Sequence, residues 1–199
     1  MTYAIIGFGK IGQALARAFA RNGLEVSVAT TRDPGSFAAD AAAIGPTIVP
    51  KTLAEAVKAD IVFLAVRFER HRDVAESLST WHGKTVIDAM NSNAPLTDMN
   101  GLLSSAYVAQ AFTGGKLVKG WNHLLAATLE TNPVVEGGHR VVFLSSDDAD
   151  AIPPVAALAK QLGFAPVNLG KLSEGGALVH ASGRTWGPLI FKDLFKKDQ

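Results

Sequence analysis

A short glycine-rich motif near the N-terminus is the first part of this sequence whose residue types and spacing could do chemistry. Its pattern is G-x-G-x-x-G, and its residues are Gly7, Phe8, Gly9, Lys10, Ile11 and Gly12. An apolar segment precedes the motif and an amphipathic helical pattern follows it, which is the context that a dinucleotide-binding loop requires. Glycines that merely turn the chain are the alternative. The context favours a loop that binds a diphosphate.

Each glycine of the motif has its own physical reason in such a loop. Gly7 permits the tight turn out of the strand, Gly9 lets the backbone approach the diphosphate, and Gly12 lets the helix pack closely on the sheet. The unpaired amides and the positive end of the helix dipole then attract the diphosphate charge.

The residues after the second apolar segment indicate which dinucleotide is bound. A site for NAD usually has Asp or Glu there, roughly 20 residues past the loop, to bind the ribose 2′-hydroxyl. This sequence has Thr30, Thr31 and Arg32 instead. Two hydroxyls and a guanidinium can bind a 2′-phosphate, which a carboxylate would repel. We therefore expect NADP(H) rather than NAD(H); the alternative is that Arg32 is a solvated loop residue.

Two further strand ends carry candidate cofactor contacts. Ala65, Val66 and Arg67 follow one apolar segment, and Asn91 follows the next. Because ligands of parallel sheets bind at the carboxyl edge, we expect these residues to border the cofactor. Asn91 would hydrogen-bond a ribose or a carboxamide, or would cap the turn before Pro95.

The elements that position these residues are visible in the hydrophobic pattern. Apolar, β-branched runs alternate with segments of helical period, and several runs are apolar at consecutive positions, as in a parallel sheet covered on both faces. This alternation predicts an α/β fold, a doubly wound, mostly parallel sheet of the Rossmann type. The expected strands are Tyr3–Ile6, Leu24–Ala29, Thr47–Val49, Ile61–Val66, Thr85–Ala89, Lys116–Gly120, Val141–Ser145 and Pro166–Leu169.

Helix signals lie between the strands. The expected helices are one that ends at Gly23, one that begins with a capping box at Thr52, one marked by Val74, Leu78 and Trp81, and one that is capped by Asp147 or Asp148 and ends at Gly163.

The sequence shows no internal linker, so we expect one principal domain. Residues 1–170 would form the NAD(P)-binding domain, and residues 171–199 a short C-terminal helical segment packed on it. Trp186, Leu189, Ile190 and Leu194 share one face of that helix. The alternatives for this face are a homodimer contact and a wall of the substrate site.

Composition excludes several classes of protein. With 19 basic and 18 acidic residues, the chain has no charge excess that would favour nucleic acid or a membrane surface. It has no cysteine, and no histidine pair has metal-binding spacing, so we expect no metal. No apolar run approaches the roughly 18 residues that span a bilayer. A cytoplasmic location is the resulting expectation.

Several segments together resemble a known family. They are Gly7–Gly12, Thr30–Arg32, Ala65–Val66, Asp88–Asn91, Val118–Asn122 and Lys160–Gly170. In this order they look like the F420-dependent NADP reductase family of compact dinucleotide-binding reductases, and the cytoplasmic domains of certain membrane metalloreductases are similar. The resemblance covers nearly the whole chain through Gly170. Its specific part is Lys119-x-x-Asn122 together with the late Leu-Gly-Phe segment.

The resemblance implies NADPH along the sheet edge, with its nicotinamide facing a shallow cleft where a planar acceptor, F420 or a flavin, would stack. It assigns the 2′-phosphate to Thr30, Thr31 and Arg32, the diphosphate to Gly9, Lys10 and Ile11, and the shaping of the cleft to Asn122. Hydride transfer between stacked rings depends on position and water exclusion more than on a protein acid or base.

The catalytic residues stay open at this point, and the candidates in the cleft are Asn122, His123 and His180. His123 is the best proton donor for a carbonyl substrate; otherwise it is a helix-start residue beside the cofactor. His180 belongs to Gly175–Arg184, which departs from the family pattern.

Three functions remain. The first is an NADPH-dependent oxidoreductase that transfers hydride between NADP(H) and a planar acceptor. The second is a non-catalytic NADP(H)-sensing regulatory module. The third, a β-hydroxyacid dehydrogenase-like enzyme, is disfavoured because too little chain follows Gly170 to form the helical second domain that carries its catalytic lysine.

Overall fold

All eight apolar segments predicted as strands belong to one sheet in the computed structural model, which describes residues 1–92 and 94–179. The observed strands are shorter by one or two residues at some ends. Their bounds are β1 Tyr3–Ile6, β2 Val26–Ala29, β3 Ile48–Pro50, β4 Ile61–Leu64, β5 Thr85–Asp88, β6 Lys116–Gly120, β9 Val141–Ser145 and β10 Ala165–Asn168.

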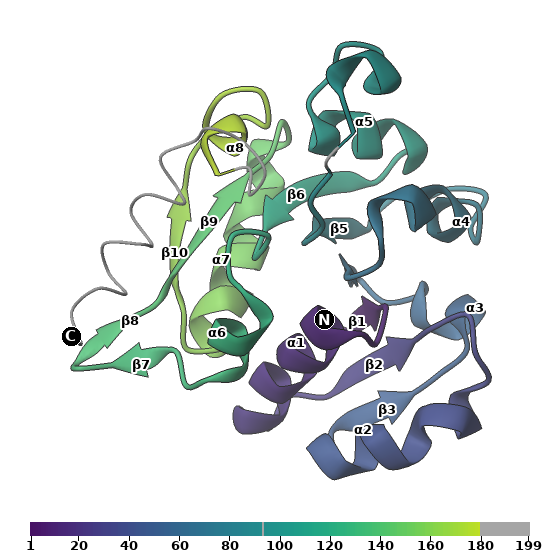
Figure 1. The fold of residues 1–199 in the computed structure, drawn as a ribbon, viewed down its shortest axis with the longest axis vertical. Helices are drawn as coiled ribbons and strands as arrows, with labels where there is room; N and C mark the ends of the chain where they lie inside the picture. Colours follow the sequence, from purple (N-terminus) through teal and green to yellow (C-terminus); the bar gives the residue numbers. More distant parts are fainter. Residues whose placement is uncertain (93, 180–199) are drawn as a thin grey trace.

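The strand order defines where a ligand can bind. The order is β10-β9-β6-β5-β4-β1-β2-β3, and every neighbouring pair is parallel except β6 and β9 (Figure 1). From β1 the chain proceeds outward to β2 and β3, and then returns to place β4 on the other side of β1. Loops that leave β1 and β4 therefore diverge, which opens a crevice at the carboxyl edge. The doubly wound, mostly parallel fold expected from the sequence is confirmed.

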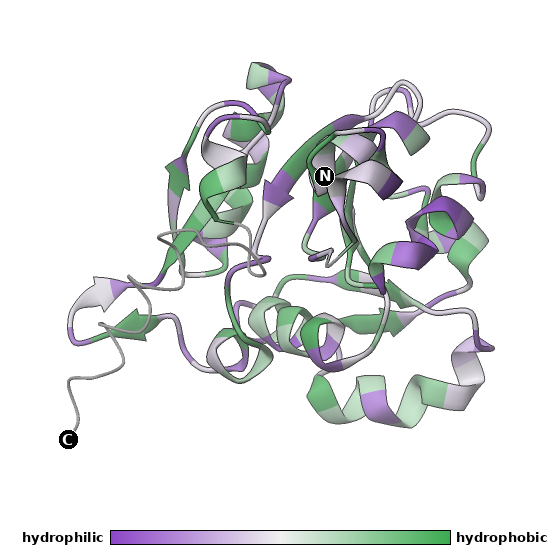
Figure 2. Cartoon of the chain, turned by 45° about the horizontal axis from the view of Figure 1, so that its top comes forward, coloured by the Kyte–Doolittle hydropathy of each residue, from purple (hydrophilic) through white to green (hydrophobic). Residues whose placement is uncertain are grey.

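Helices cover both faces of this sheet, and each strand sends alternate side chains to the two layers. Ile5 and Phe63 pack in one hydrophobic cluster, whereas Ala4 and Val62 pack in the other. The first layer holds α1 Lys10–Arg21, α2 Ala38–Ile44, α6 Ala126–Glu130 and α7 Ile152–Gln161; the second holds α3 Leu53–Ala56, α4 His71–Ala75 and α5 Ser104–Ala111. The strands are accordingly hydrophobic, while the outer helical faces carry polar residues (Figure 2).

Helix starts and ends agree with the sequence signals in part. The capping box at Thr52 is present, and its hydroxyl accepts a hydrogen bond from the Glu55 amide. Gly163 ends α7 with a φ of +87°, a conformation that favours glycine. The third helix is shorter than predicted, because α4 ends at Ala75. Trp81 lies outside it, and its indole N–H donates to the Ala75 carbonyl.

The predicted aspartate cap of α7 is wrong. The helix begins after a 3₁₀ turn at Ala149–Ala151, and Asp148 makes no side-chain capping bond there. Asp147 instead accepts a hydrogen bond from the Leu172 amide at 3.1 Å. The carboxylate thus holds the segment that follows β10, and the prolines after Ile152 begin the helix.

A hairpin before β9 was missing from the sequence prediction. Its strands are β7 Val134–Val135 and β8 Gly138–His139, joined by Glu136 and Gly137 at positive φ. Positive φ at both central residues is the geometry of a type I′ turn. The Glu-Gly-Gly sequence was therefore an available signal. β9 follows this hairpin and runs antiparallel to β6.

The C-terminal helical face predicted from Trp186, Leu189, Ile190 and Leu194 lies outside the described residues. The described part of this segment contains α8, Gly175–Leu178, which packs near β9. Within residues 1–92 and 94–179 no helix is both long and apolar enough to cross a membrane.

We predict that Gly12→Ala destabilises the fold severely. A Cβ at Gly12 would lie 1.9 Å from the Gly7 carbonyl oxygen, and backbone cannot yield as a side-chain tip can. We expect a loss of about 3 kcal/mol or more in the free energy of unfolding, at the upper end of overpacking effects. Urea denaturation measures it. The matched control is Gly9→Ala, expected within about 1 kcal/mol of the wild type. A Gly12→Ala variant as stable as the control would contradict this account of the turn.

Candidate functional site

The glycine loop leaves β1 by a backbone turn that only glycine fits. Gly7 has a φ of +103°, and its amide donates to the Ala29 carbonyl at the end of β2. A Cβ at Gly7 would lie 2.3 Å from the carbonyl oxygen of Ala65, which follows β4. The first glycine therefore packs between the ends of both neighbouring strands.

Gly9 is different, because nothing in the fold requires a glycine there. Its φ of −80° suits any residue, and an added Cβ would meet no atom within 4 Å. Gly9 is also the N-cap of α1 and makes no side-chain capping bond. The first-turn amides of α1 have no acceptor inside the helix. A side chain at Gly9 would enter the open space beside this turn, and a diphosphate in that space would suit the free amides.

Phe37 connects the glycine loop to the predicted 2′-phosphate residues. The ring of Phe8, the second residue of the motif, is nearly buried and lies 5.5 Å from the Phe37 ring. The Arg32 guanidinium lies 5.6 Å from the centre of the same ring, within the range of a cation–π contact. Lys10, by contrast, is exposed at the start of α1.

The Thr30–Arg32 turn presents hydroxyls and a cation to solvent. Thr30 accepts a hydrogen bond from the Arg32 amide, which leaves its hydroxyl proton to donate, and Thr31 and Arg32 are exposed. The nearest carboxylate in sequence, Asp33, accepts from the Gly35 amide at 2.8 Å. Asp33 therefore caps a 3₁₀ turn, and the chemistry of the Thr30–Arg32 turn suits a phosphate.

A cleft of about 280 Å³ lies beside the glycine loop, where the ends of β4, β5 and β6 meet the start of α6. Its size is near the lower end of small-molecule sites. The lining residues are Ile11, Ala65, Val66, Ala89, Met90, Asn91, Asn122, His123, Leu124, Leu125 and Ala126. Six predicted site residues thus come together. Arg67 is exposed at the start of the next turn, and His180 lies outside the described residues.

Two asparagines join the strand ends in this cleft. The Asn91 amide donates to the Asn122 carbonyl at 2.8 Å, and the Asn122 amide donates to Asn91 Oδ1 at 3.1 Å. The Asn122 amide also donates to the Val179 carbonyl at 2.9 Å. Asn91 therefore pairs with its neighbour across the cleft, an arrangement that the sequence did not predict.

A buried polar network lies directly beneath the asparagines, and sequence reasoning missed it. Asp88 and Lys119 are register partners on β5 and β6, and both are almost fully buried. Lys119 Nζ donates to Ser105 Oγ at 2.8 Å, and Ser105 Oγ donates to Asp88 Oδ2 at 2.6 Å. The available signal was an acid and a base ending neighbouring apolar strands, since buried charges need partners.

His123 lies in the cleft but is a poor proton donor. Burial lowers its pKa to about 4, against a partly compensating hydrogen bond to the Val141 carbonyl at 3.2 Å. Because that carbonyl only accepts, Nε2 carries the proton of a neutral imidazole. The ring also packs 5.0 Å from the Phe143 ring. His123 is therefore uncharged at neutral pH and helps to shape the cleft wall.

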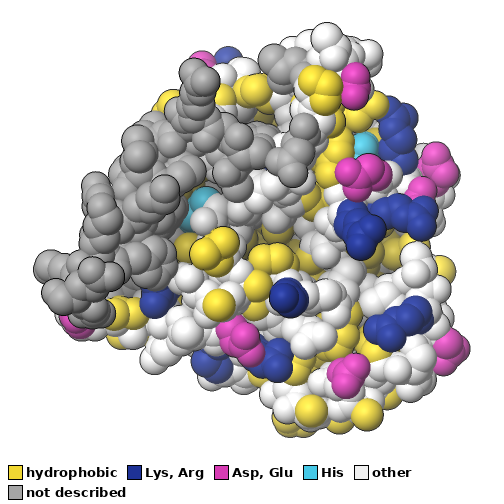
Figure 3. Space-filling model, in the orientation of Figure 1, with side chains coloured by type: hydrophobic (Ala, Val, Ile, Leu, Met, Phe, Trp, Pro, Cys, Tyr) yellow, Lys and Arg dark blue, Asp and Glu magenta, His cyan; other side chains and the backbone are white. Residues whose placement is uncertain are grey.

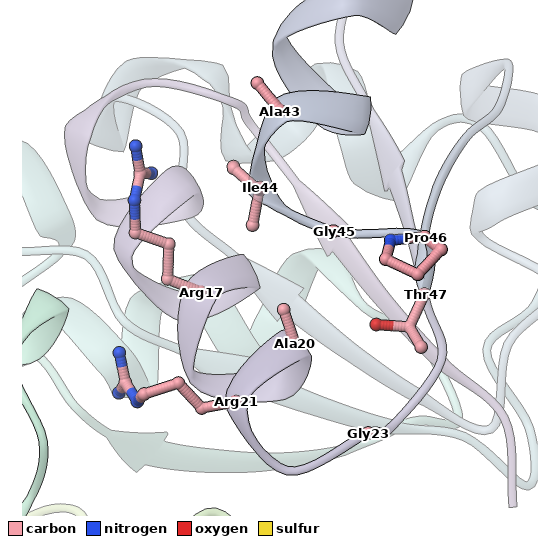
Figure 4. A pocket seen from close by; sticks show the side chains of 9 residues that line it. All are labelled: Arg17, Ala20, Arg21, Gly23, Ala43, Ile44, Gly45, Pro46 and Thr47. Atoms are coloured by element: carbon pink, nitrogen blue, oxygen red, sulfur yellow. The ribbon is translucent and has the colours of Figure 1, made fainter.

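A larger hollow, about 500 Å³, lies away from this edge, between α1 and the segment after α2 (Figure 4). Two arginines line it, but both bind α6: Arg17 Nε lies 2.9 Å from Glu130 Oε1, and Arg21 donates to the Glu130 carbonyl at 2.6 Å. This hollow adjoins the starts of β2 and β3, opposite the strand ends where ligands of such sheets bind.

Surface charge over the described residues is mixed. Lys and Arg side chains are interspersed with Asp and Glu on the face drawn in Figure 3. In the described part of the chain, no group of three or more His, Asp or Glu side chains could hold a metal ion.

Comparison with known proteins finds relatives for the part of the chain that holds the glycine loop. Residues 2–92, which hold β1 to β5, the glycine loop and Thr30–Arg32, match the family described as NADP oxidoreductase, coenzyme F420-dependent. The N-terminal part of the chain is thus similar to a family of NADP-dependent oxidoreductases, as the resemblance implied.

Two solved structures share the fold of nearly the whole chain. A hypothetical protein from Sinorhizobium meliloti is 38% identical, with 92% of this chain and 91% of that chain covered and a TM-score of 0.86. A protein from Arthrobacter sp. FB24, described as an F420-dependent NADP reductase, is 27% identical over 98% and 93% of the chains, with a TM-score of 0.72.

A curated relative is longer. The metalloreductase STEAP2 of Mus musculus is 30% identical over 176 residues, which cover 87% of this chain but 34% of that protein. The chain thus spans about a third of the length of the curated relatives it matches.

We predict a pH-dependent loss of stability that depends on His123. Its folded pKa of about 4 is below the ordinary 6.5, so the unfolded chain binds the extra proton between these values. The stability is complete above pH 6.5 and falls as the pH drops towards 4. Between about pH 7.5 and pH 5, urea unfolding should show a loss of about 2 kcal/mol from this group.

The variant His123→Gln should lack this part of the pH dependence, while the exposed control His82→Gln should keep it. The same slope in both variants would refute the assignment to His123.

Proposed function

We propose that this chain binds NADPH along the carboxyl edge of the sheet. The 2′-phosphate would contact Thr30, Thr31 and Arg32, the diphosphate would contact the amides after Gly9, and the nicotinamide would enter the cleft beside Ile11. The observation that carries this proposal is the contrast among the glycines. Gly7 and Gly12 are required by backbone packing, whereas the packing of the described residues requires no glycine at Gly9, and a bound diphosphate would account for a glycine there.

The proposed reaction is hydride transfer to a planar acceptor such as F420 or a flavin. NADPH, when bound, supplies the hydride. The apolar side chains of the cleft, among them Ile11, Val66 and Met90, exclude water from the nicotinamide end. The one histidine among the lining residues is neutral, so it cannot protonate a carbonyl efficiently. This favours an acceptor that needs position rather than a protein acid.

The size of the cleft and the exposure of its mouth support an acceptor that stacks on the nicotinamide. Leu125, which lines the cleft, is 72% exposed. A cleft of about 280 Å³ leaves no enclosed room for a nicotinamide and a tricyclic ring together. The acceptor would therefore lie at the mouth of the cleft against Leu125.

A ferric chelate is the second candidate acceptor. The observation that favours it is the 30% identity to a metalloreductase over most of this chain. A non-catalytic NADP(H) sensor is the remaining alternative.

One assay separates these functions. The purified chain is mixed with NADPH and, in turn, F420, FMN, FAD, quinones and ferric chelates, and the near-ultraviolet absorbance of NADPH is followed. Oxidation with F420 or a flavin supports the proposal, and oxidation with ferric chelates alone supports the second candidate. Tight NADPH binding with no oxidation by any acceptor favours the sensor.

We predict that Gly9→Val abolishes dinucleotide binding without unfolding the chain. The valine side chain would occupy the space above the first turn of α1, where the diphosphate must lie. Titration calorimetry should show NADPH and NADH binding lost alike, with the urea midpoint nearly unchanged. Retained affinity in a folded variant would refute the placement of the diphosphate.

We predict that Arg32→Ala selectively weakens NADPH. Loss of a charge-assisted contact should raise its Kd by about 10- to 100-fold, while the Kd for NADH changes by less than about 3-fold. The matched control is Arg70→Ala, which removes an exposed guanidinium paired with Asp73. Equal losses of NADPH and NADH would sink the assignment of Arg32.

A further inference from the structure

Two pairs of polar residues join the ends of β5 and β6, a lower pair and an upper pair. Asp88 and Lys119 are register partners near the carboxyl ends of these strands. Three residues further along the chain, beyond each strand, stands an asparagine, Asn91 after Asp88 and Asn122 after Lys119. The lower pair is an ion pair and the upper pair is an amide pair. Both pairs therefore join the same two strand ends.

The lower pair fixes where the chain leaves both strands. Lys119 Nζ lies 3.6 Å from Asp88 Oδ2, and Ser105 of α5 bridges the two by hydrogen bonds. Asp88 Oδ1 accepts from the Met90 amide at 2.9 Å, and Lys119 Nζ lies 3.4 Å from the Met90 carbonyl. The carboxylate and the ammonium thus hold both polar groups of the Met90 backbone, next to Asn91.

The upper pair fixes the Asn122 side chain in one orientation. Both hydrogens of its amide nitrogen are used, by Asn91 Oδ1 and by the Val179 carbonyl, so the amide cannot rotate without losing two hydrogen bonds. The preceding residue, Trp121, has a φ of +59°, uncommon for a residue with a side chain. Its indole is fully buried between Phe63 and Phe164.

One polar atom of the Asn122 side chain, Oδ1, is not used in these hydrogen bonds. Asn122 Oδ1 is buried and has no hydrogen-bond partner among the described residues, although nearly all buried polar groups in proteins have one. Asn122 lines the cleft beside Ile11 and Ala65, where the other walls are largely apolar. A ligand with one N–H donor on an otherwise apolar ring would satisfy this oxygen.

We propose that Asn122 Oδ1 accepts a hydrogen bond from the carboxamide N–H of the nicotinamide ring, and that Asn91, Asp88, Ser105 and Lys119 are positioning residues for it. The inference rests on the proposed NADPH function and assigns a residue to one group of that cofactor. A carboxamide held at Asn122 cannot rotate, so the residue sets which face of the ring is turned to the mouth of the cleft.

Four ligands test this contact without relying on turnover. They are NADPH, its 3-acetylpyridine analogue, in which a methyl replaces the amide nitrogen, its thionicotinamide analogue, which keeps the N–H, and 2′-phospho-ADP-ribose, which has no nicotinamide. Calorimetry on the wild type should show the acetylpyridine analogue bound roughly 5- to 10-fold more weakly than NADPH. The thionicotinamide analogue should bind like NADPH.

Variants assign the effect to Asn122. In Asn122→Leu the preference for NADPH over the acetylpyridine analogue should fall to about 1, with the affinity for 2′-phospho-ADP-ribose unchanged. Asn91→Leu and Ser105→Ala should reduce the preference in the same way, because they free the Asn122 side chain. A purely structural role would instead lower the urea midpoint and leave the preference intact.

The experiment distinguishes failure of the Asn122 assignment from failure of the proposed NADPH binding. If 2′-phospho-ADP-ribose binds but the wild type shows no preference between NADPH and the acetylpyridine analogue, the Asn122 assignment is overturned while NADP(H) binding stands. A preference that persists in Asn122→Leu also overturns it. If neither NADPH nor 2′-phospho-ADP-ribose binds the wild type, the proposed function fails first. The wild-type ligand series decides the question even where Asn122→Leu fails to fold.

Discussion

The close contact of backbone with backbone at the turn from β1 into α1 is the constraint on which this structure depends. Gly7 packs against the Ala65 carbonyl of the next strand in the sheet, and Gly12 packs against Gly7 itself. These contacts bring α1 down onto the sheet at the point where the strand order reverses. As a result, α1 begins at the carboxyl edge of the sheet, and a loop short enough to fold locally lies where we propose that a charged ligand binds.

The rest of the edge is built outward from that turn in both directions. On one side, Phe37 lies between Phe8 and Arg32, so a single ring orders both the glycine loop and the cationic turn. On the other side, the asparagine pair and the ion pair beneath it join β5 to β6. The end of this edge to which we assign the phosphates is therefore exposed and polar, whereas the end to which we assign the nicotinamide is narrow and mostly apolar.

Local patterns were sufficient to predict the sheet and the glycine turn from β1 into α1. Each strand is a run of adjacent apolar residues, and a G-x-G-x-x-G loop acts through its own backbone, so neither depends on distant partners.

The contacts of Asn91, Asp88 and Lys119 could not be predicted in this way, because their partners come from other strands and from α5. The lowered pKa of His123 likewise comes from burial beside β9, an antiparallel strand that follows an unpredicted hairpin. Trp81 continues the helical period of the sequence, but it lies beyond the end of α4 and its indole donates to the Ala75 carbonyl.

α6 is attached to α1, and both helices border the cleft. α6 begins at the cleft wall, at Ala126, and ends at Glu130, where Arg17 and Arg21 of α1 bind its carboxylate and its carbonyl. α1 thus begins at the glycine loop to which we assign the diphosphate, and its last turns hold α6, whose start lies at the cleft. Because α1 and α6 are joined at Glu130, the sides of the cleft that carry Ile11 and Ala126 belong to one packed pair of helices.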